Sequence, residues 1–161
     1  MKFQFGQYDI FTDVDKNREI YKQLPFVSES CQCDGCVNYQ DAIFYAPKEV
    51  LDFFKKLGIN IQKPSEVYVY SSEADGIRLF YGGFYHLTGK VMSGKSAWTP
   101  YDNDSGEAWW DQSQTYEICE GYRVSFQSNC SLLEKEFSMS AIQMDIEFHV
   151  PWVLEKENQY Q

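Results

Sequence analysis

The pattern of apolar and polar positions is most regular near the C-terminal end of the chain. Apolar residues alternate with polar ones over residues 122–127 and again over residues 142–150. A period of two residues is typical of a strand with one face on a core and the other in solvent. We therefore predict two half-buried antiparallel strands, the second ending at Pro151. The polar residues 155–161 lack such a pattern, and we expect them to fray.

A helical period follows Pro47. The apolar positions recur with the spacing of one helix face, at Val50, Leu51, Phe54 and Leu57. Proline is tolerated in a first helical turn, and Gly58 favours the left-handed conformation that ends a helix. The sequence therefore predicts a helix over residues 47–57 whose apolar stripe faces a core.

Shorter apolar runs come after this helix. Residues 66–70 and 77–81 have the composition of strands, and the turn between them ends in Asp75-Gly76, which predicts an antiparallel hairpin. Gly82 and Gly83 form either a second tight turn or a kink in one long strand that continues to residue 91. Residues 92–120 have no clear period, which indicates a long loop or a set of short strands.

These elements predict an α+β fold made mainly of antiparallel β-strands. The strands form a sandwich or one strongly curved sheet, with one principal helix at about residues 47–57 against a face. The N-terminal part adds a short strand at Phe3 and Phe5 and weak helical character over residues 13–23. A length of 161 residues suits one domain, so we assign residues 1–161 to a single domain.

Composition and charge narrow the classes of function. The chain has 24 acidic and 14 basic residues, for a formal net charge of −10. This charge repels nucleic-acid backbones and anionic membranes, so neither is an expected partner. An aromatic content of 17% favours strands around a thick aromatic core. The five cysteines, without an export signal or an apolar run of membrane-spanning length, predict a soluble, cytoplasmic protein.

Cys31, Cys33 and Cys36 are close enough in the sequence to converge on one point, and Asp34 and Gly35 between them favour a tight loop. A structural zinc site takes four ligands, of which this cluster would supply three. The fourth would come from a distant candidate: Cys119, Cys130, His86 or His149. Two other interpretations remain open, namely free thiols that pack as small hydrophobes and a disulfide that forms in air. Zinc is the one cofactor that the sequence indicates.

The segment 92–120 combines three of the four tryptophans with many carboxylates. Long loops in compact domains often carry function. We predict a binding surface formed by Trp98, Tyr101, Trp109 and Trp110. In an extended segment Trp109 and Trp110 point in opposite directions, so we expect one in the core and the other at the surface or in a pocket.

These features favour a non-catalytic acidic protein that binds or inhibits a basic protein partner, in the manner of an immunity protein. Negative charge accelerates the encounter with a cationic surface, and desolvated aromatic residues anchor the complex. The same features have another explanation, because acidic residues also keep proteins soluble and most aromatic residues of a β-rich domain lie in its core.

Two further functions stay open as alternatives, a zinc-stabilised structural domain and a metal-dependent enzyme. The enzyme would use the cysteine cluster or the side chains of Asp145, Glu147 and His149, which share one face of the last strand and could bind a metal or act as acid and base. Alternation alone also explains this face as solvent-exposed, which we favour. Two acidic runs, 13–24 and 102–113, lack the glycine and glutamate that a calcium loop requires, so we reject calcium.

Three segments, CQCDGCVNY, DGIRLFYGGFYHLTGKV and DIEFHVPWVL, together resemble a group of small uncharacterised bacterial proteins of similar length. The resemblance covers most of the chain. It implies no activity, cofactor or site residue, because none is assigned in that group. The functional predictions therefore rest on the residues of this chain.

Overall fold

In the computed structural model, which describes residues 1–137 and 140–161, the strands form three antiparallel sheets. The largest has the order β3-β4-β10-β9-β8. Its strands are β3 (Glu66–Ser72), β4 (Arg78–Thr88), β8 (Tyr116–Cys119), β9 (Tyr122–Gln127) and β10 (Ala141–Pro151). The second sheet has the order β1-β2-β5, with β1 (Lys2–Phe5), β2 (Tyr8–Phe11) and β5 (Lys90–Ser93). The third is the hairpin of β6 (Trp98–Pro100) and β7 (Ala108–Trp110).

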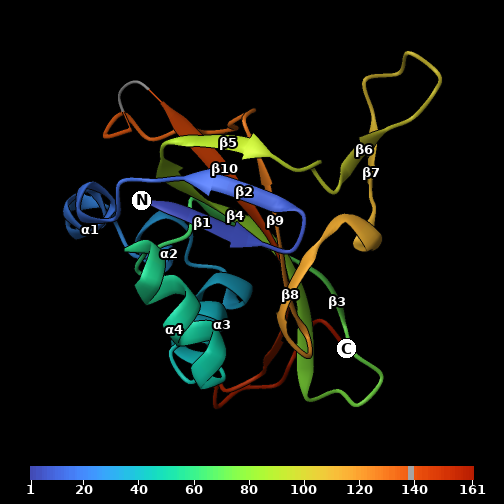
Figure 1. Cartoon of the computed structure of the whole chain (residues 1–161). Coiled ribbons are helices and arrows are strands. Elements are labelled where there is room, and N and C mark those ends of the chain that lie inside the picture. The colour runs from blue at the N-terminus through green and yellow to red at the C-terminus, as the bar shows by residue number, and fades with distance from the viewer. Residues whose placement is uncertain (138–139) are drawn as a thin grey trace.

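The α-helices gather on one side of the five-stranded sheet (Figure 1). They are α1 (Val14–Gln23), α2 (Val27–Ser30), α3 (Asp34–Ile43) and α4 (Lys48–Leu57), and a short 3-10 helix spans Gln112–Gln114. No helix in the described part of the chain combines the length and the apolarity needed to cross a membrane.

An aromatic core fills the space between the helices and the large sheet. The ring of Phe54 on α4 lies 4.8 Å from the ring of Tyr85 on β4, measured between centroids. The Tyr85 hydroxyl contacts the Tyr39 hydroxyl of α3 at 2.6 Å and donates to the carbonyl of Ile61 at 2.5 Å. Tyr85 therefore connects two helices and a loop to the centre of the sheet, with its own polar atom satisfied.

The three-stranded sheet packs on the same core. Phe5 of β1 stacks on Phe126 of β9, with ring centroids 6.0 Å apart, and Tyr8 of β2 donates to the Ser125 hydroxyl at 3.0 Å. One continuous cluster of buried residues therefore includes both sheets and the helices. The predicted fold class, α+β with mainly antiparallel strands, is confirmed.

The predicted helix over residues 47–57 is confirmed as α4. Pro47 precedes its first turn, and Gly58 ends it in the left-handed conformation with φ of +75°. The cysteine cluster differs from the prediction, because Asp34 and Gly35 belong to helix α3 instead of a tight loop. Gly35 is needed for close packing, since a Cβ there would lie 2.9 Å from both the Tyr160 hydroxyl and a methyl group of Val69.

The two glycines in the aromatic run lie inside one uninterrupted strand, β4. A Cβ on Gly83 would overlap the carbonyl oxygen of Glu66, and a Cβ on Gly82 would overlap the rings of Tyr68 and Tyr70. The irregularity lies on the neighbouring strand, where the register of β3 shifts between Val69 and Ser71. Close approach of β3, and not a turn, therefore explains both glycines.

The C-terminal residues do not fray as predicted. Asn158 is buried, and the Tyr160 ring lies 6.4 Å from the Trp152 ring. The Tyr160 hydroxyl accepts a hydrogen bond of 3.2 Å from the backbone N–H of Gly35. The tail thus closes against the start of α3, next to the cysteines.

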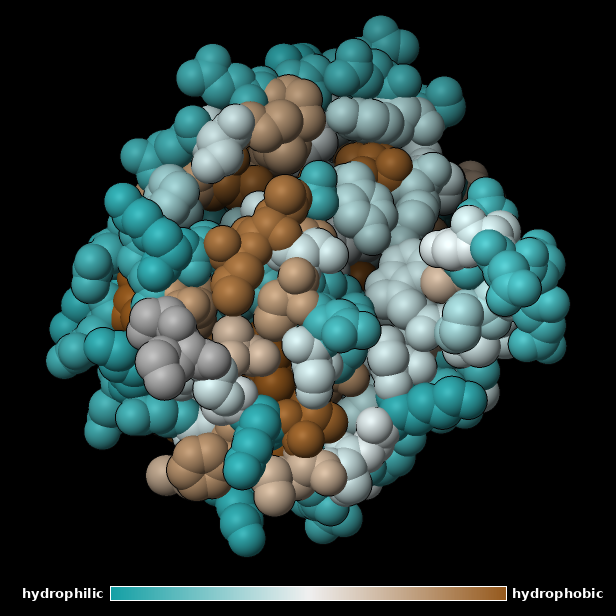
Figure 2. Space-filling model, turned by 90° about the horizontal axis from the view of Figure 1, so that it is seen from above, coloured by the Kyte–Doolittle hydropathy of each residue, from teal (hydrophilic) through white to brown (hydrophobic). Residues whose placement is uncertain are grey.

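Residues 97–111, which we call the arm, extend from the body as the β6-β7 hairpin (Figure 1). The segment that lacked a clear period is therefore a set of short strands. Figure 2 shows the molecule from above, with a hydrophilic margin and hydrophobic residues exposed toward the centre of that face.

Candidate functional site

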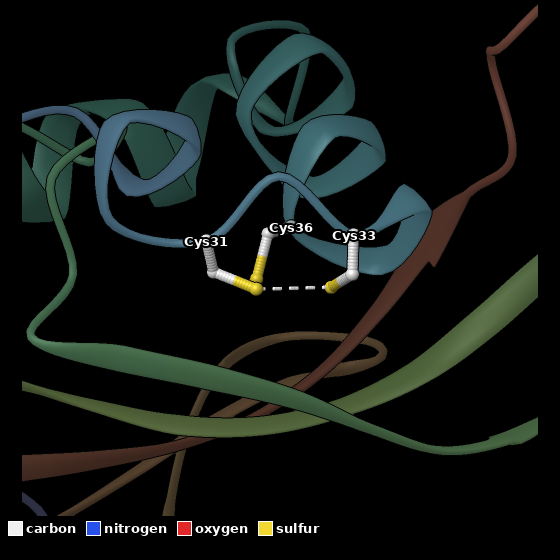
Figure 3. Close-up of side chains that lie close together, drawn as sticks. All are labelled: Cys31, Cys33 and Cys36. Carbon is white, nitrogen blue, oxygen red and sulfur yellow. Dashed lines mark hydrogen bonds between the residues drawn. The ribbon is translucent and has the colours of Figure 1, made fainter.

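The three clustered cysteines meet where α2 ends and α3 begins. Cys31 follows α2, Cys33 directly precedes α3, and Cys36 lies in the first turn of α3. Their sulfur atoms all lie within 4.8 Å of one another, and those of Cys31 and Cys33 are 3.2 Å apart. The close-up in Figure 3 shows the side chains turned to the same side of the chain. The predicted convergence is confirmed.

Backbone hydrogen bonds fix this arrangement. The N–H of Cys31 donates to the carbonyl of Val27 at 3.0 Å and completes α2, and the N–H of Val37 donates to the carbonyl of Cys33 at 3.0 Å and begins α3. The side chain of Asp34 forms an ion pair with Lys156 of the C-terminal tail. Both helix ends and the tail therefore hold the cluster in place.

The three thiols differ in exposure and in acidity. Cys31 and Cys33 are exposed, whereas Cys36 is buried. The backbone N–H of Cys33 donates to the Cys31 sulfur and lowers the pKa of that thiol, with a further contribution from the neighbouring thiols. Burial raises the pKa of the Cys36 thiol, and the adjacent sulfurs raise it further. Packing as small buried hydrophobes therefore describes Cys36 but not Cys31 or Cys33.

A metal ion bound here would have three protein ligands. Of the residues that the structure describes, no other cysteine, histidine or carboxylate joins the group. The candidates for a fourth ligand lie elsewhere, with Cys119 in β8, Cys130 after β9, His86 in β4 and His149 in β10. The prediction of a distant fourth protein ligand is therefore wrong.

The donor set still suits zinc. Thiolates are preferred zinc ligands, and Zn–S bonds of about 2.3 Å in a tetrahedron place the sulfurs roughly 3.8 Å apart. The observed limit of 4.8 Å between the sulfurs lies within a small side-chain rotation of that value. The cluster could therefore hold a metal ion such as zinc.

The four aromatic residues of the predicted binding surface divide into two pairs. Trp98 and Trp110 face each other across the hairpin, with ring centroids 5.2 Å apart, and are partly buried. Tyr101 and Trp109 are the exposed pair, at 50% and 41% of their full accessible surface. Trp109 lies at the surface as expected, but Trp110 is only partly buried and lies outside the core, so the prediction of one core tryptophan is wrong.

The acidic face of the last strand is not solvent-exposed as predicted. Asp145 and Glu147 are only 3% and 4% exposed. Gln127 donates to Asp145 at 2.6 Å, and Gln112 donates to Glu147 at 2.6 Å. Residues from β9 and from the 3-10 helix that follows the arm therefore cover this face, which alternation within one strand cannot reveal.

The carboxylates and histidine of that strand also do not form a common site. His149 is partly buried and pairs through Nδ1 with Glu73, away from Asp145 and Glu147. Within the described ranges, the ligand atoms of these three residues do not converge. This geometry does not favour the metal-dependent enzyme alternative at the Asp145, Glu147 and His149 face.

Each histidine has a carboxylate partner that the sequence does not predict. The His86 Nδ1 atom lies 2.8 Å from an oxygen of Glu134, and Glu73 pairs with His149. These partners are 48 and 76 residues apart in the sequence. No local pattern marks either pair, because each depends on how the loops return to the sheet.

No family model, no curated protein and no solved structure matches this chain. The resemblance to a group of small bacterial proteins therefore stays a prediction. The function has to be argued from the geometry of the chain itself.

Proposed function

We propose that the protein binds one zinc ion through Cys31, Cys33 and Cys36 and that this zinc stabilises the fold. The observation that carries the proposal is the convergence of the three sulfur atoms within 4.8 Å. Three thiolates form a soft donor set that suits zinc, and a water molecule or a small solute would occupy the fourth position. The site would differ in this respect from closed structural sites with four protein ligands, so a structural role depends on the helices that the metal would join.

A structural role follows from the elements that the metal would join. Cys31 terminates α2 and Cys36 lies in the first turn of α3. Through Tyr39, α3 contacts Tyr81 and Tyr85 at the centre of the sheet. Because α2 and α3 fix the cluster in the folded chain, zinc should bind the folded protein more tightly than the unfolded chain. This difference in binding free energy would add to the free energy of unfolding.

Elemental analysis of the protein purified in reducing buffer tests this proposal. We expect about one zinc per chain, and a loss of about 2 to 4 kcal/mol in the free energy of unfolding when a chelator removes it. Cys33→Ser should contain no zinc and should not respond to the chelator. Cys130→Ser is the matched control, because Cys130 lies outside the cluster, and it should keep both the metal and the response. Zinc-free wild type, or zinc retained by Cys33→Ser, would contradict the proposal.

We also propose that the arm binds a basic protein partner, as a second and independent function. The exposure of Trp109 and Tyr101 on a projecting hairpin supports it. Between Lys95 and Arg123 the chain has no basic residue, but it has six carboxylates: Asp102, Asp104, Glu107, Asp111, Glu117 and Glu120. Charge would accelerate association, and desolvation of the exposed rings would slow dissociation.

A further inference from the structure

The molecule has a cavity of about 820 Å³ where α1, the end of α3, α4 and residues 58–63 meet. Much of its lining is apolar and comes from Tyr21, Leu51, Phe54, Ile59 and Ile61, with the exposed ring of Phe44. Sites for small molecules have this size and this mainly apolar character, with a few polar groups that orient the ligand.

The polar groups of the cavity are strongly biased in charge. Four basic residues line it, namely Arg18, Lys22, Lys55 and Lys63, and within the described ranges no acidic residue does. The whole chain has 24 acidic and only 14 basic residues, so the rest of the molecule has the opposite bias. Arg18 pairs with Asp15 at 2.7 Å, whereas no carboxylate of the described residues lies within 4 Å of the other three ammonium groups.

Lys63 is the most informative of the four, because it is only 8% exposed. Its Nζ donates to the carbonyl of Tyr21 at 2.8 Å and lies 4.8 Å from the centroid of the Phe26 ring. A lysine is almost never this buried unless an anion pairs with it, since burying an uncompensated charge is costly. An ammonium group has three donors, so hydrogen bonding to Tyr21 leaves donors for a ligand.

The helix ends around the cavity limit the kind of anion. Lys22 and Lys55 lie in the last turns of α1 and α4, where the helix dipole presents partial negative charge. Phosphate sites usually have the opposite arrangement, with helix N-termini directed at the ligand. A carboxylate has a single charge and two acceptor oxygens, so it suits ammonium donors without the help of a helix N-terminus.

We propose that this cavity binds a medium-chain acyl carboxylate. The carboxylate contacts Lys63 and the rim lysines Lys22 and Lys55, and the acyl chain packs on Phe54 and Leu51. This site is formed by other residues than the cysteine cluster and the arm, so it is independent of both proposed functions. The carboxylate supplies the counter-charge that Lys63 lacks.

Isothermal titration calorimetry of the full-length protein tests the proposal with three probes that share one chain length. Decanoate should bind with one site per chain, whereas decan-1-ol and decyltrimethylammonium should bind at least about tenfold more weakly. This order is the reverse of what non-specific association with a chain of net charge −10 would give. Stronger binding of the alcohol or of the cation would overturn the assignment.

Substitutions locate the site and identify the source of the carboxylate. Lys63→Met should weaken decanoate binding at least about tenfold, and the exposed double substitution Lys22→Met with Lys55→Met should also weaken it if Lys63→Met fails to fold. Lys95→Met lies outside the cavity and should bind like wild type. Wild-type affinity in both cavity variants would overturn the proposal. So would tighter binding of a short peptide with a free C-terminal leucine, because the ligand would then be a peptide carboxylate.

Discussion

Asp145 is a carboxylic acid in the middle of the five-stranded sheet. Gln143 donates to one of its oxygens at 2.7 Å and Gln127 to the other at 2.6 Å, and both bonds lower the pKa of Asp145. Burial nevertheless dominates and raises the pKa of this group from its usual value near 3.8 to about 6. Between about pH 4 and pH 6 the folded protein therefore still holds a proton at Asp145 that the unfolded chain has already released.

This shift predicts a pH-dependent effect of Asp145→Asn. Because the folded pKa is raised, the stability linked to the proton is present below pH 3.8 and is lost as the pH rises through 6, by on the order of 3 kcal/mol. The variant cannot titrate at this position, so its free energy of unfolding relative to wild type should increase between pH 4 and pH 7. Urea unfolding at several pH values measures this difference.

Asp75 provides a control, because its pKa in the folded protein is lowered whereas that of Asp145 is raised. The backbone N–H of Ile77 donates to this exposed carboxylate and lowers its pKa, with a contribution from Arg78. Stability linked to this group is present above its unfolded pKa and is lost as the pH falls. Asp75→Asn should therefore lose stability relative to wild type as the pH rises from 2 to about 5. Parallel curves for wild type and Asp145→Asn would contradict the role of burial at Asp145.

Among the helices, α4 was the most predictable element and α3 the least. The period, the proline and the glycine of α4 are all local signals, and the helix begins and ends within one residue of the prediction. In α3 the pair Asp34-Gly35 has the composition of a turn, which hides the helix. The structural reason for Gly35 is contact with Val69 and Tyr160, and neither residue is near it in the sequence.

The end of α4 allows a matched test with two glycines. Gly58 and Gly106 both have φ of +75°, so alanine is strained at each. A Cβ on Gly58 would also overlap the backbone carbonyl of Val14, which cannot rotate away, whereas nothing lies within 4 Å of a Cβ on Gly106. We expect Gly106→Ala to cost about 1 kcal/mol and Gly58→Ala about 3 kcal/mol or more in the free energy of unfolding. Chemical denaturation measures both changes. If the two variants lose the same free energy of unfolding, the backbone at the contact between α1 and α4 can shift at little cost to accommodate the new Cβ.

At the scale of the whole molecule, the sequence predicted what depends on neighbours along the chain. Alternation identified β9 and β10, and the Asp75-Gly76 turn identified the β3-β4 hairpin. Features that depend on distant contacts were missed: the cover over Asp145 and Glu147, the lack of a fourth cysteine or histidine ligand among the residues that the structure describes, and the cavity beside Lys63. Each of these requires knowing which loop returns to which face of the sheet.

The arm is suited to a test that separates stability from binding. Thr99 and Trp109 face each other in the ladder of the hairpin. Replacing residues 100–108 by Asn-Gly would join them through a two-residue turn and keep the Trp98 and Trp110 pair at the base. The replaced residues are exposed throughout, so the free energy of unfolding should change by less than about 1 kcal/mol.

Unlike stability, binding of the basic partner should depend strongly on the arm. Wild-type protein on a column should capture a basic protein from lysate at low ionic strength. The variant with the shortened arm lacks Tyr101 and three carboxylates, so it should no longer capture that protein. Within the full-length arm, replacing Asp102, Asp104 and Glu107 by their amides should slow association and weaken its salt dependence, whereas Trp109→Ala should mainly accelerate dissociation. Capture that is unchanged by the shortened arm would contradict binding through this hairpin. A large loss of stability would instead show that the tip supports the fold.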